Sequence, residues 1–346
     1  MKRIRDYGVN IGSYETGKLN KISDVPGVKV GHVTLCEKSV NTGVTVIMPS
    51  EDNLFRNKMI ASAHVFNGFG KSTGLMQINE LGTLESPIVL TNTLSVGDAL
   101  KGLVSYKLDR NHVIGTTTGT VNGVVCECND GYLNDIRGFH VKPYHVHDAI
   151  KNTIEDFDEG AVGAGTGMAA FALKGGIGSS SRIININDKS YTIGVLVMTN
   201  MGKKKNLTIA GKNIGKQILE IDSKDSDIPD KGSIIIIVAT DIPLSKNQME
   251  RVSKRTIVGL SRTGSNMSNG SGEVVVGFST ANRIPHDNDG LINIKTVHDD
   301  DLDQVFDAVA DATEESVLNS MITAKSVVGR DGHIRKSLVE YFHKTY

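Results

Sequence analysis

The sequence predicts an α/β fold in which helices cover layered β-sheets. Two observations support this prediction: short runs rich in β-branched residues recur along the chain, and helical signals lie between or after them. Strand runs combined with helical runs in this way are typical of layered α/β folds. The chain has 346 residues, 39% of them hydrophobic, which is enough to bury a large core.

Five runs are expected to form strands that are buried on at least one face. Each is short and rich in Val, Ile or Thr, and turn-forming residues lie close to its ends. The expected strands are residues 43–49, 86–92, 191–200, 232–240 and 272–280.

Two longer segments carry the pattern of amphipathic helices. Residues 243–264 open with Pro243 and with Ser245, a candidate N-cap, and they end at Gly264. Residues 299–325 begin with acidic side chains and then place apolar residues at helical spacing. We find no internal repeat and expect one domain over residues 1–346.

The charge balance argues against several classes of partner. Lys and Arg total 38 against 39 for Asp and Glu, a net charge of −1, so we expect neither nucleic acid nor an anionic membrane as a partner. The N-terminal residues lack the apolar stretch of a signal peptide, and no run approaches the roughly 18 apolar residues of a membrane span. A soluble, cytoplasmic protein is the expectation.

Metal and cofactor signals are weak. Cys36, Cys126 and Cys128 are too few for a disulfide framework, and the C-x-C pair alone offers too few ligands for zinc. His145 and His147 would share one face of a strand and could bind a metal there, but no third ligand is evident nearby. We therefore expect buried or edge-strand thiols, a structural histidine pair, and no metal or cofactor.

A glycine-rich segment at residues 163–167 resembles a phosphate-binding loop only superficially. It lacks the Lys-Ser/Thr pair that completes such a loop. Close backbone packing, which glycine permits, is the favoured interpretation.

The most abrupt local change in the chain lies between Gly232 and Ser233. The acidic, linker-like segment 220–232 contains five acidic residues, and Ser233 then opens a run of four isoleucines. On local sequence alone this is a loop leading into a buried strand. The alternative is a cut site, because cleavage before Ser233 would give the serine its own α-amine, with a pKa of about 7.7–8.0. Such an amine could act as the base that a serine hydroxyl needs to become a nucleophile.

Seven further motifs, together with the C-terminal segment 327–333, decide between these readings. They occur in one order along the chain: residues 24–32, 67–74, 91–100, 128–138, 160–168, 239–244 and 260–282. With them the chain resembles the L-aminopeptidase/D-esterase (DmpA) family, which includes the β-peptidyl aminopeptidases, from about residue 20 to 333.

The resemblance implies an αββα sandwich of the DmpA/ornithine acetyltransferase type, similar to N-terminal-nucleophile hydrolases. It implies self-cleavage into an α chain, 1–232, and a β chain, 233–346, that stay together and assemble as a homo-oligomer. The implied substrates are small peptides, amides or esters with a free amine, from which the enzyme releases the N-terminal amino acid through an acyl-Ser233 ester. Preference among α-L, D and β-amino substrates stays open.

The resemblance also implies the site residues. Ser233 matches the nucleophile, Ser271 and Glu273 the assisting pair, Tyr132 the active-site tyrosine, and Asn200 the asparagine near the reacting carbonyl. These types suit the chemistry: Ser271 and Glu273, two apart, share one face of an extended segment. Tyr132 and Asn200 carry donors for an oxyanion.

A free substrate amine also needs a carboxylate. Glu127 and Asp130, close to Tyr132, are the candidates for this role. Met201 stands where the family usually has a small or aromatic residue, which leaves the shape of the local pocket open.

Two other functions compete with the aminopeptidase. The first is acyl transfer, as in the related ornithine acetyltransferases, although those use threonine where this chain has Ser233. The second is an uncleaved, non-catalytic relative kept for binding or assembly.

Overall fold

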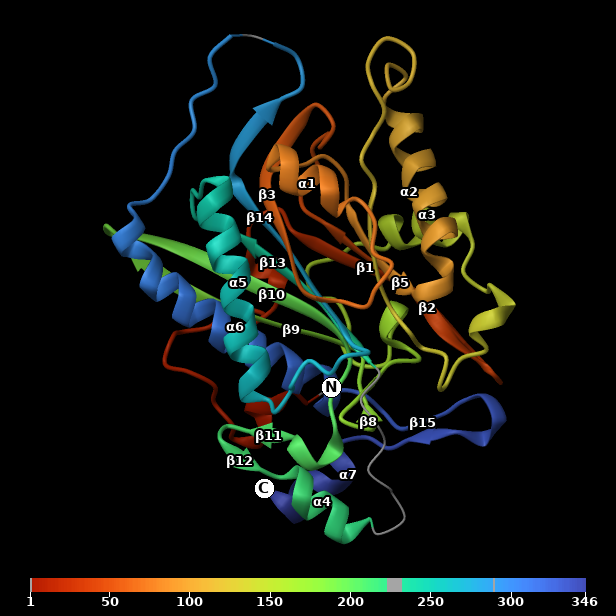
Figure 1. Ribbon diagram of the computed structural model, residues 1–346. Coiled ribbons are helices and arrows are strands. Elements are labelled where there is room, and N and C mark those ends of the chain that lie inside the picture. Colours follow the sequence, from red (N-terminus) through yellow and green to blue (C-terminus); the bar gives the residue numbers. More distant parts are fainter. Residues whose placement is uncertain (1, 223–231, 289) are drawn as a thin grey trace.

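Two stacked β-sheets with helices on both outer faces form the body of the protein (Figure 1). The computed structural model describes residues 2–222, 232–288 and 290–346. Most of the expected acidic loop, residues 223–231, lies outside the described residues.

The smaller sheet has four strands in the order β1-β2-β5-β6. They are β1 (Lys29–Glu37), β2 (Val40–Met48), β5 (Ile88–Asn92) and β6 (Val124–Cys128). Its outer face packs against α2 (Val96–Arg110) and α3 (Pro143–Lys151).

The larger sheet has six strands in the order β4-β3-β14-β13-β10-β9. They are β3 (Asn57–Gly68), β4 (Thr83–Leu84), β9 (Ile177–Ile186), β10 (Lys189–Asn200), β13 (Ser233–Thr240) and β14 (Gly272–Pro285). Its outer face packs against α5 (Lys246–Arg262) and α6 (Leu302–Ile322).

Short elements complete the chain. The helices are α1 (Leu75–Leu81), α4 (Gly215–Ile221) and α7 (Val339–Thr345). The two-stranded ladders are β7 (Ala169–Ala170) with β8 (Leu173–Lys174), β11 (Thr208–Ile209) with β12 (Lys212–Asn213), and β15 (Val327–Val328) with β16 (Ile334–Arg335).

The run of four isoleucines explains how β13 joins the layers. Ile234 and Ile236 belong to the core beneath α5 and α6, whereas Ile235 and Ile237 belong to the core between the two sheets. Successive side chains of a strand point to opposite faces, so a strand buried on both sides needs apolar residues at every position. The expected αββα layering is confirmed.

All five expected strands and both long helices are present. Ser245 caps α5, since its hydroxyl accepts a hydrogen bond from the backbone N–H of Gln248 at 3.2 Å. The last expected strand continues to Pro285, because its end pairs with the start of β3 after a bulge.

The expectation that His145 and His147 lie on a strand is wrong. Both lie on α3, which begins at Pro143. Residues two apart on a helix do not face each other. His145 accepts a hydrogen bond from the backbone N–H of Lys142, and the ring of His147 contacts the carbonyl of Gly102.

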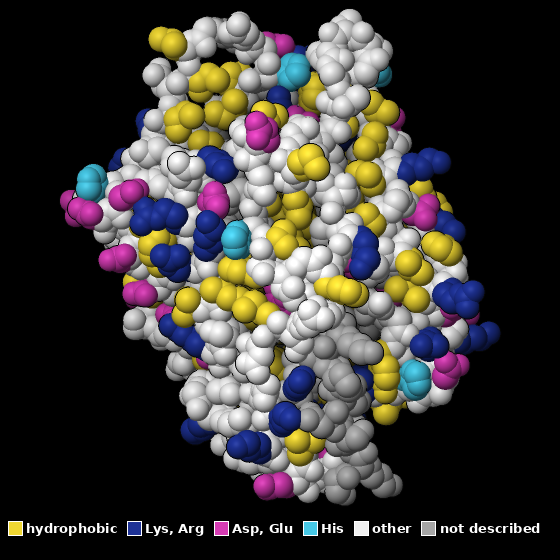
Figure 2. Space-filling model, viewed as in Figure 1, with side chains coloured by type: hydrophobic (Ala, Val, Ile, Leu, Met, Phe, Trp, Pro, Cys, Tyr) yellow, Lys and Arg dark blue, Asp and Glu magenta, His cyan; other side chains and the backbone are white. Residues whose placement is uncertain are grey.

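Surface charge is mixed in sign. Figure 2 shows basic and acidic side chains interspersed over the visible face. Across the described part of the chain, no helix combines the length and apolar character needed to cross a membrane. Within the same residues, no three His, Cys, Asp or Glu side chains group as metal ligands.

A fully buried ion pair fastens α6 to the larger sheet. Arg182 of β9 lies 2.7 Å from Glu315 of α6, and both side chains are completely buried. Arg5 and Asn20, from the N-terminal segment, also hydrogen-bond Glu315. Burial by itself raises the pKa of Glu315, but the bond from Arg5 and the charge of Arg182 outweigh it and lower the pKa overall.

Replacing Glu315 with Gln is expected to destabilise the fold by about 3–5 kcal/mol, because it leaves the Arg182 guanidinium buried without its counter-charge. Urea unfolding measures the change. The control is Glu250→Gln at a partly exposed pair on α5, where a loss below about 1 kcal/mol is expected. Equal losses of stability in the two variants would contradict the role given to the Arg182–Glu315 pair.

The same pair makes stability depend on pH. Because the pKa of Glu315 is lowered in the folded state, its contribution to stability is complete above the ordinary glutamate pKa and is lost as pH falls through the lowered value.

Candidate active site

Ser233 meets two distant segments of the chain at one end of the larger sheet. It is the first residue of β13, where it pairs antiparallel with Asn200 of β10 and parallel with Gly272 of β14. The side chain is buried, with 7% of its surface exposed. Strand register therefore brings Asn200 and the segment that contains Ser271 and Glu273 next to Ser233.

The peptide bond before Ser233 is held by backbone contacts. The N–H of Gly272 donates a hydrogen bond to the carbonyl oxygen of Gly232 at 3.2 Å. A Cβ on Gly232 would lie 1.7 Å from the carbonyl oxygen of Asn200, so no residue with a side chain fits at this position. The carbonyl of the predicted cut site is thus polarised by a backbone donor, and glycine is required at its residue by the close approach of the Asn200 carbonyl.

The hydroxyl of Ser233 faces the core between the two sheets. By strand alternation it shares the face of Ile235, and there it lies beside the Cys128 thiol of β6. The Cys128 thiol donates to the carbonyl of Met198 at 3.6 Å, so its sulfur is left able to accept a weak hydrogen bond from the Ser233 hydroxyl. Burial raises the pKa of Cys128 well above its usual value, which keeps it a neutral thiol.

Ser271 and Glu273 form the predicted pair. The Ser271 hydroxyl donates to a carboxylate oxygen of Glu273, and both side chains are fully buried. Register sets Glu273 beside Ile234, so the pair occupies the face of the sheet opposite to the Ser233 hydroxyl. This arrangement favours contact with the main-chain nitrogen of Ser233 over contact with its hydroxyl.

Asn200 has a fixed side chain on the same face as the Ser233 hydroxyl, since directly paired residues of antiparallel strands share a face. Its Oδ1 accepts from the backbone N–H of Ala169 at 2.9 Å, and its Nδ2 donates to the carbonyl of Asn129 at 2.9 Å. A side-chain amide has two N–H hydrogens. One therefore stays available to a reacting carbonyl oxygen.

Glu127 and Asp130, the two carboxylates considered for amine binding, differ in their surroundings. Glu127 accepts hydrogen bonds from the backbone N–H of Lys71, at 2.8 Å, and from the hydroxyl of Thr93. It makes no ion pair with any cationic side chain of the described residues. Asp130 is completely buried and accepts from Asn134 at 3.0 Å; burial raises its pKa to about 7.

Tyr132 makes no hydrogen bond or ring contact with the other predicted residues within the described part of the chain. Its ring stacks on His333 with the centroids 4.5 Å apart, and the guanidinium of Arg335 lies 3.6 Å from the ring centre. None of its contacts with described residues reaches Ser233 or Asn200. The residue of this turn that does contact Asn200 is Asn129, through its carbonyl.

Sequence reasoning missed Cys128, Asn129 and Gly272. Cys128 was considered only as a thiol or a zinc ligand, and nothing in one sequence tells which strand faces Ser233. Asn129 and Gly272 act through backbone groups, which residue types do not reveal. The one feature of the sequence that pointed to Gly272 was its position between Ser271 and Glu273.

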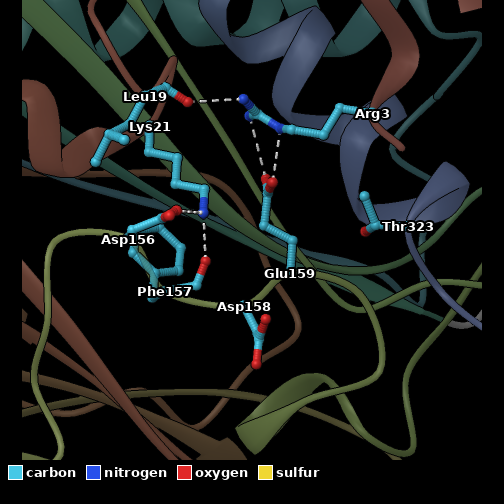
Figure 3. Close-up of a pocket in the computed structure, with 8 residues that line it drawn as sticks. All are labelled: Arg3, Leu19, Lys21, Asp156, Phe157, Asp158, Glu159 and Thr323. Atoms are coloured by element: carbon cyan, nitrogen blue, oxygen red, sulfur yellow. Dashed lines mark hydrogen bonds and ion pairs between the residues drawn. The ribbon is translucent and has the colours of Figure 1, made fainter. Parts of the chain in front are cut away.

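A separate cavity of about 310 Å³ lies where the N-terminal segment crosses residues 156–159 (Figure 3). It shares no lining residue with the predicted site. Its charged groups pair with one another: Arg3 lies 2.7 Å from Glu159, and Lys21 lies 2.6 Å from Asp156. These pairings favour a structural junction over a substrate site.

Comparison with known proteins identifies the family of the chain. Residues 20–335 match the model of peptidase family S58. β-Peptidyl aminopeptidase BapA of Sphingosinicella microcystinivorans is 36% identical, over 96% of this chain and 88% of that protein.

Two solved structures are also similar. The PH0078 protein of Pyrococcus horikoshii OT3 superposes with a TM-score of 0.95 at 51% identity, covering 99% of this chain and 98% of that one. The L-aminopeptidase D-Ala-esterase/amidase of Ochrobactrum anthropi, a prototype of the serine aminopeptidases with a variant of the Ntn-hydrolase fold, superposes with a TM-score of 0.90 at 34% identity, covering 100% of both chains. The chain therefore belongs to peptidase family S58 and is an N-terminal-nucleophile serine aminopeptidase.

Proposed function

We propose that the chain cuts itself between Gly232 and Ser233 and then releases N-terminal amino acids from small peptides, amides or esters. The observation that carries the proposal is the convergence of the Gly232 carbonyl, the Gly272 N–H donor and Ser233 at one strand end. The products of the cut are an α chain, 1–232, and a β chain, 233–346, within a single αββα domain.

Self-cleavage is an acyl shift followed by hydrolysis. The hydroxyl oxygen of Ser233 bonds to the carbonyl carbon of Gly232, the C–N bond breaks, and the hydroxyl proton passes to the released amine. Water then hydrolyses the ester, which frees the Gly232 carboxylate and restores the hydroxyl. The Gly272 N–H supports the charge that develops on the carbonyl oxygen, a contribution of about 10²–10³ in rate for a typical donor.

Substrate turnover repeats this chemistry on another carbonyl. The new α-amine of Ser233 takes the hydroxyl proton and passes it to the leaving amine, alcohol or ammonia. The free hydrogen of the Asn200 amide stabilises the oxyanion. The Ser271–Glu273 pair, on the opposite face from the hydroxyl, holds and orients the Ser233 amine.

Glu127 is the proposed partner of the substrate amine. It is buried, with 4% of its surface exposed, and has no ion-pair partner in the described part of the chain. A buried carboxylate is costly unless a cation pairs with it, and a substrate ammonium supplies one. Asp130 is left out of this role, because it is completely buried and bonded to Asn134. Tyr132 stays a predicted donor.

Substrate preference and assembly belong to the same proposal. The names of the relatives refer to β-peptides, L-amino acids and D-alanine esters, so a panel of α-L, D and β-aminoacyl p-nitroanilides, amides and esters measures the preference.

We propose a cytoplasmic homo-oligomer of αβ units. Exposed apolar side chains such as Leu291, fully exposed, and Met76, 88% exposed, support a subunit interface.

Intact-mass analysis tests the cut. Purified wild-type protein is expected to give two species, ending at Gly232 and beginning at Ser233, whereas Ser233→Ala stays full length because it lacks the attacking hydroxyl. Ser261→Ala, an exposed serine of α5, is the control and should be cut normally. A single full-length wild-type species after prolonged incubation would contradict self-cleavage.

Acetyl transfer between amino acids without hydrolysis would favour the acyltransferase alternative.

Glu127→Gln tests the amine partner. It is expected to raise KM by about 10- to 100-fold with a smaller change in kcat, because a charged hydrogen bond is worth about 1.5–3 kcal/mol. Steady-state kinetics on the best substrate of the panel measure the effect. Glu80→Gln, an exposed carboxylate of α1, should leave KM unchanged. A wild-type KM in Glu127→Gln removes Glu127 from this role.

A further inference from the structure

Lys174 of β8 has an unusual environment for a lysine. Its side chain is completely buried, and its ammonium group donates to the backbone carbonyls of Gly165, at 3.0 Å, Met168, at 2.7 Å, and Gly175, at 2.6 Å. An ammonium has three donors, and all three are used. Lys174 therefore ties together both ends of the segment 165–175.

This segment holds one side of the Asn200 amide. Ala169 lies within it, and its backbone N–H donates to Asn200 Oδ1 at 2.9 Å. The backbone N–H of Gly175 also donates to the Met168 carbonyl, at 3.2 Å, which closes the segment on itself. The position of the Ala169 donor thus depends on the carbonyls that Lys174 binds.

The other side of the Asn200 amide is held next to Asp130. Asn200 Nδ2 donates to the carbonyl of Asn129, the residue before Asp130. Asp130 packs against segment 165–175, since a Cβ on Gly167 would lie 2.9 Å from the Asp130 Cβ. Both anchors of the Asn200 side chain therefore belong to segments that contain one member of a buried, oppositely charged pair.

The two charges depend on each other. Burial raises the pKa of Asp130 to about 7 and lowers that of Lys174 to about 7, and in each case the charge of the other residue opposes the shift. Removing one of the two groups leaves the other buried without an opposite charge near it. The Ala169 N–H and the Asn129 carbonyl, which hold the Asn200 amide, would then lose the buried charges that support their segments.

We propose that Lys174 is a positioning residue for the peptidase reaction: with Asp130 as its counter-charge, it fixes segment 165–175 and thereby aims the Asn200 amide at the reacting carbonyl. The inference rests on the proposed function, in which Asn200 supplies an oxyanion donor. Lys174 itself touches neither Ser233 nor Asn200 among the described contacts.

A double-mutant cycle with Lys174→Met and Asn200→Ala tests this role. Lys174→Met is expected to lower kcat by about 10- to 100-fold, since small displacements of a catalytic donor cost up to about 10² in rate. KM should stay within about twofold, because substrate binding is not altered. In the Asn200→Ala background the same substitution should add less than about a twofold loss.

The control is Lys107→Met, which removes another buried lysine, 3% exposed, from α2. Its kcat should equal that of the wild type. A wild-type kcat in Lys174→Met, or an equal loss with and without Asn200, overturns the proposal. If Lys174→Met does not accumulate as folded protein, Asp130→Asn replaces it in the cycle, with the same outcomes counting for and against.

A structural readout separates this inference from the proposed function. If the wild-type protein hydrolyses no substrate of the panel, the proposed function fails, and the crystal structure of Lys174→Met then decides the positioning role. A displacement of the Asn200 amide by more than about 0.5 Å supports the role. An unmoved amide overturns it.

Discussion

The contact between Gly232 and the Asn200 carbonyl constrains the whole site. The chain enters β13 so close to the end of β10 that a single added carbon at residue 232 would overlap the Asn200 oxygen. This approach sets the register that pairs Ser233 with Asn200 on one side and with Gly272 on the other. Ser233, the proposed nucleophile, the Asn200 amide and the Gly272 N–H are thus positioned by strand pairing, which is more rigid than a loop.

Buried charge supports this geometry at two levels. The Arg182–Glu315 pair joins α6 to β9 far from any reacting atom, and it stabilises the sheet as a whole. Lys174 instead binds the backbone of segment 165–175, which carries the Ala169 donor to Asn200, and Asp130 packs against that segment. Both pairs are expensive to bury, and both lie where segments distant in sequence must keep a fixed relation.

How much the sequence could predict depends on the kind of interaction. The alternation within Ile234–Ile237 and the Ser245 cap are local, so the central strand and α5 followed from residue types. The contact of Cys128 with Ser233 was not predictable, because it depends on which strand of the second sheet lies opposite β13. The strand expected at His145 and His147 was wrong, since Pro143 starts a helix there. Tyr132 was assigned by motif alone, and its stack on His333 is a tertiary contact that a motif does not contain.

The place of β13 and β14 in the larger sheet has a consequence for how the cut protein refolds. Both strands belong to residues 233–346, yet β3 flanks them on one side and β10 on the other, and both neighbours belong to residues 1–232. A chain cut before Ser233 would therefore remain one interleaved sheet. Its folding, however, would no longer be unimolecular: once unfolded, the two fragments must find each other, and recovery would depend on concentration. The cut would thus convert a reversible fold into a largely one-way assembly, made once from the intact chain.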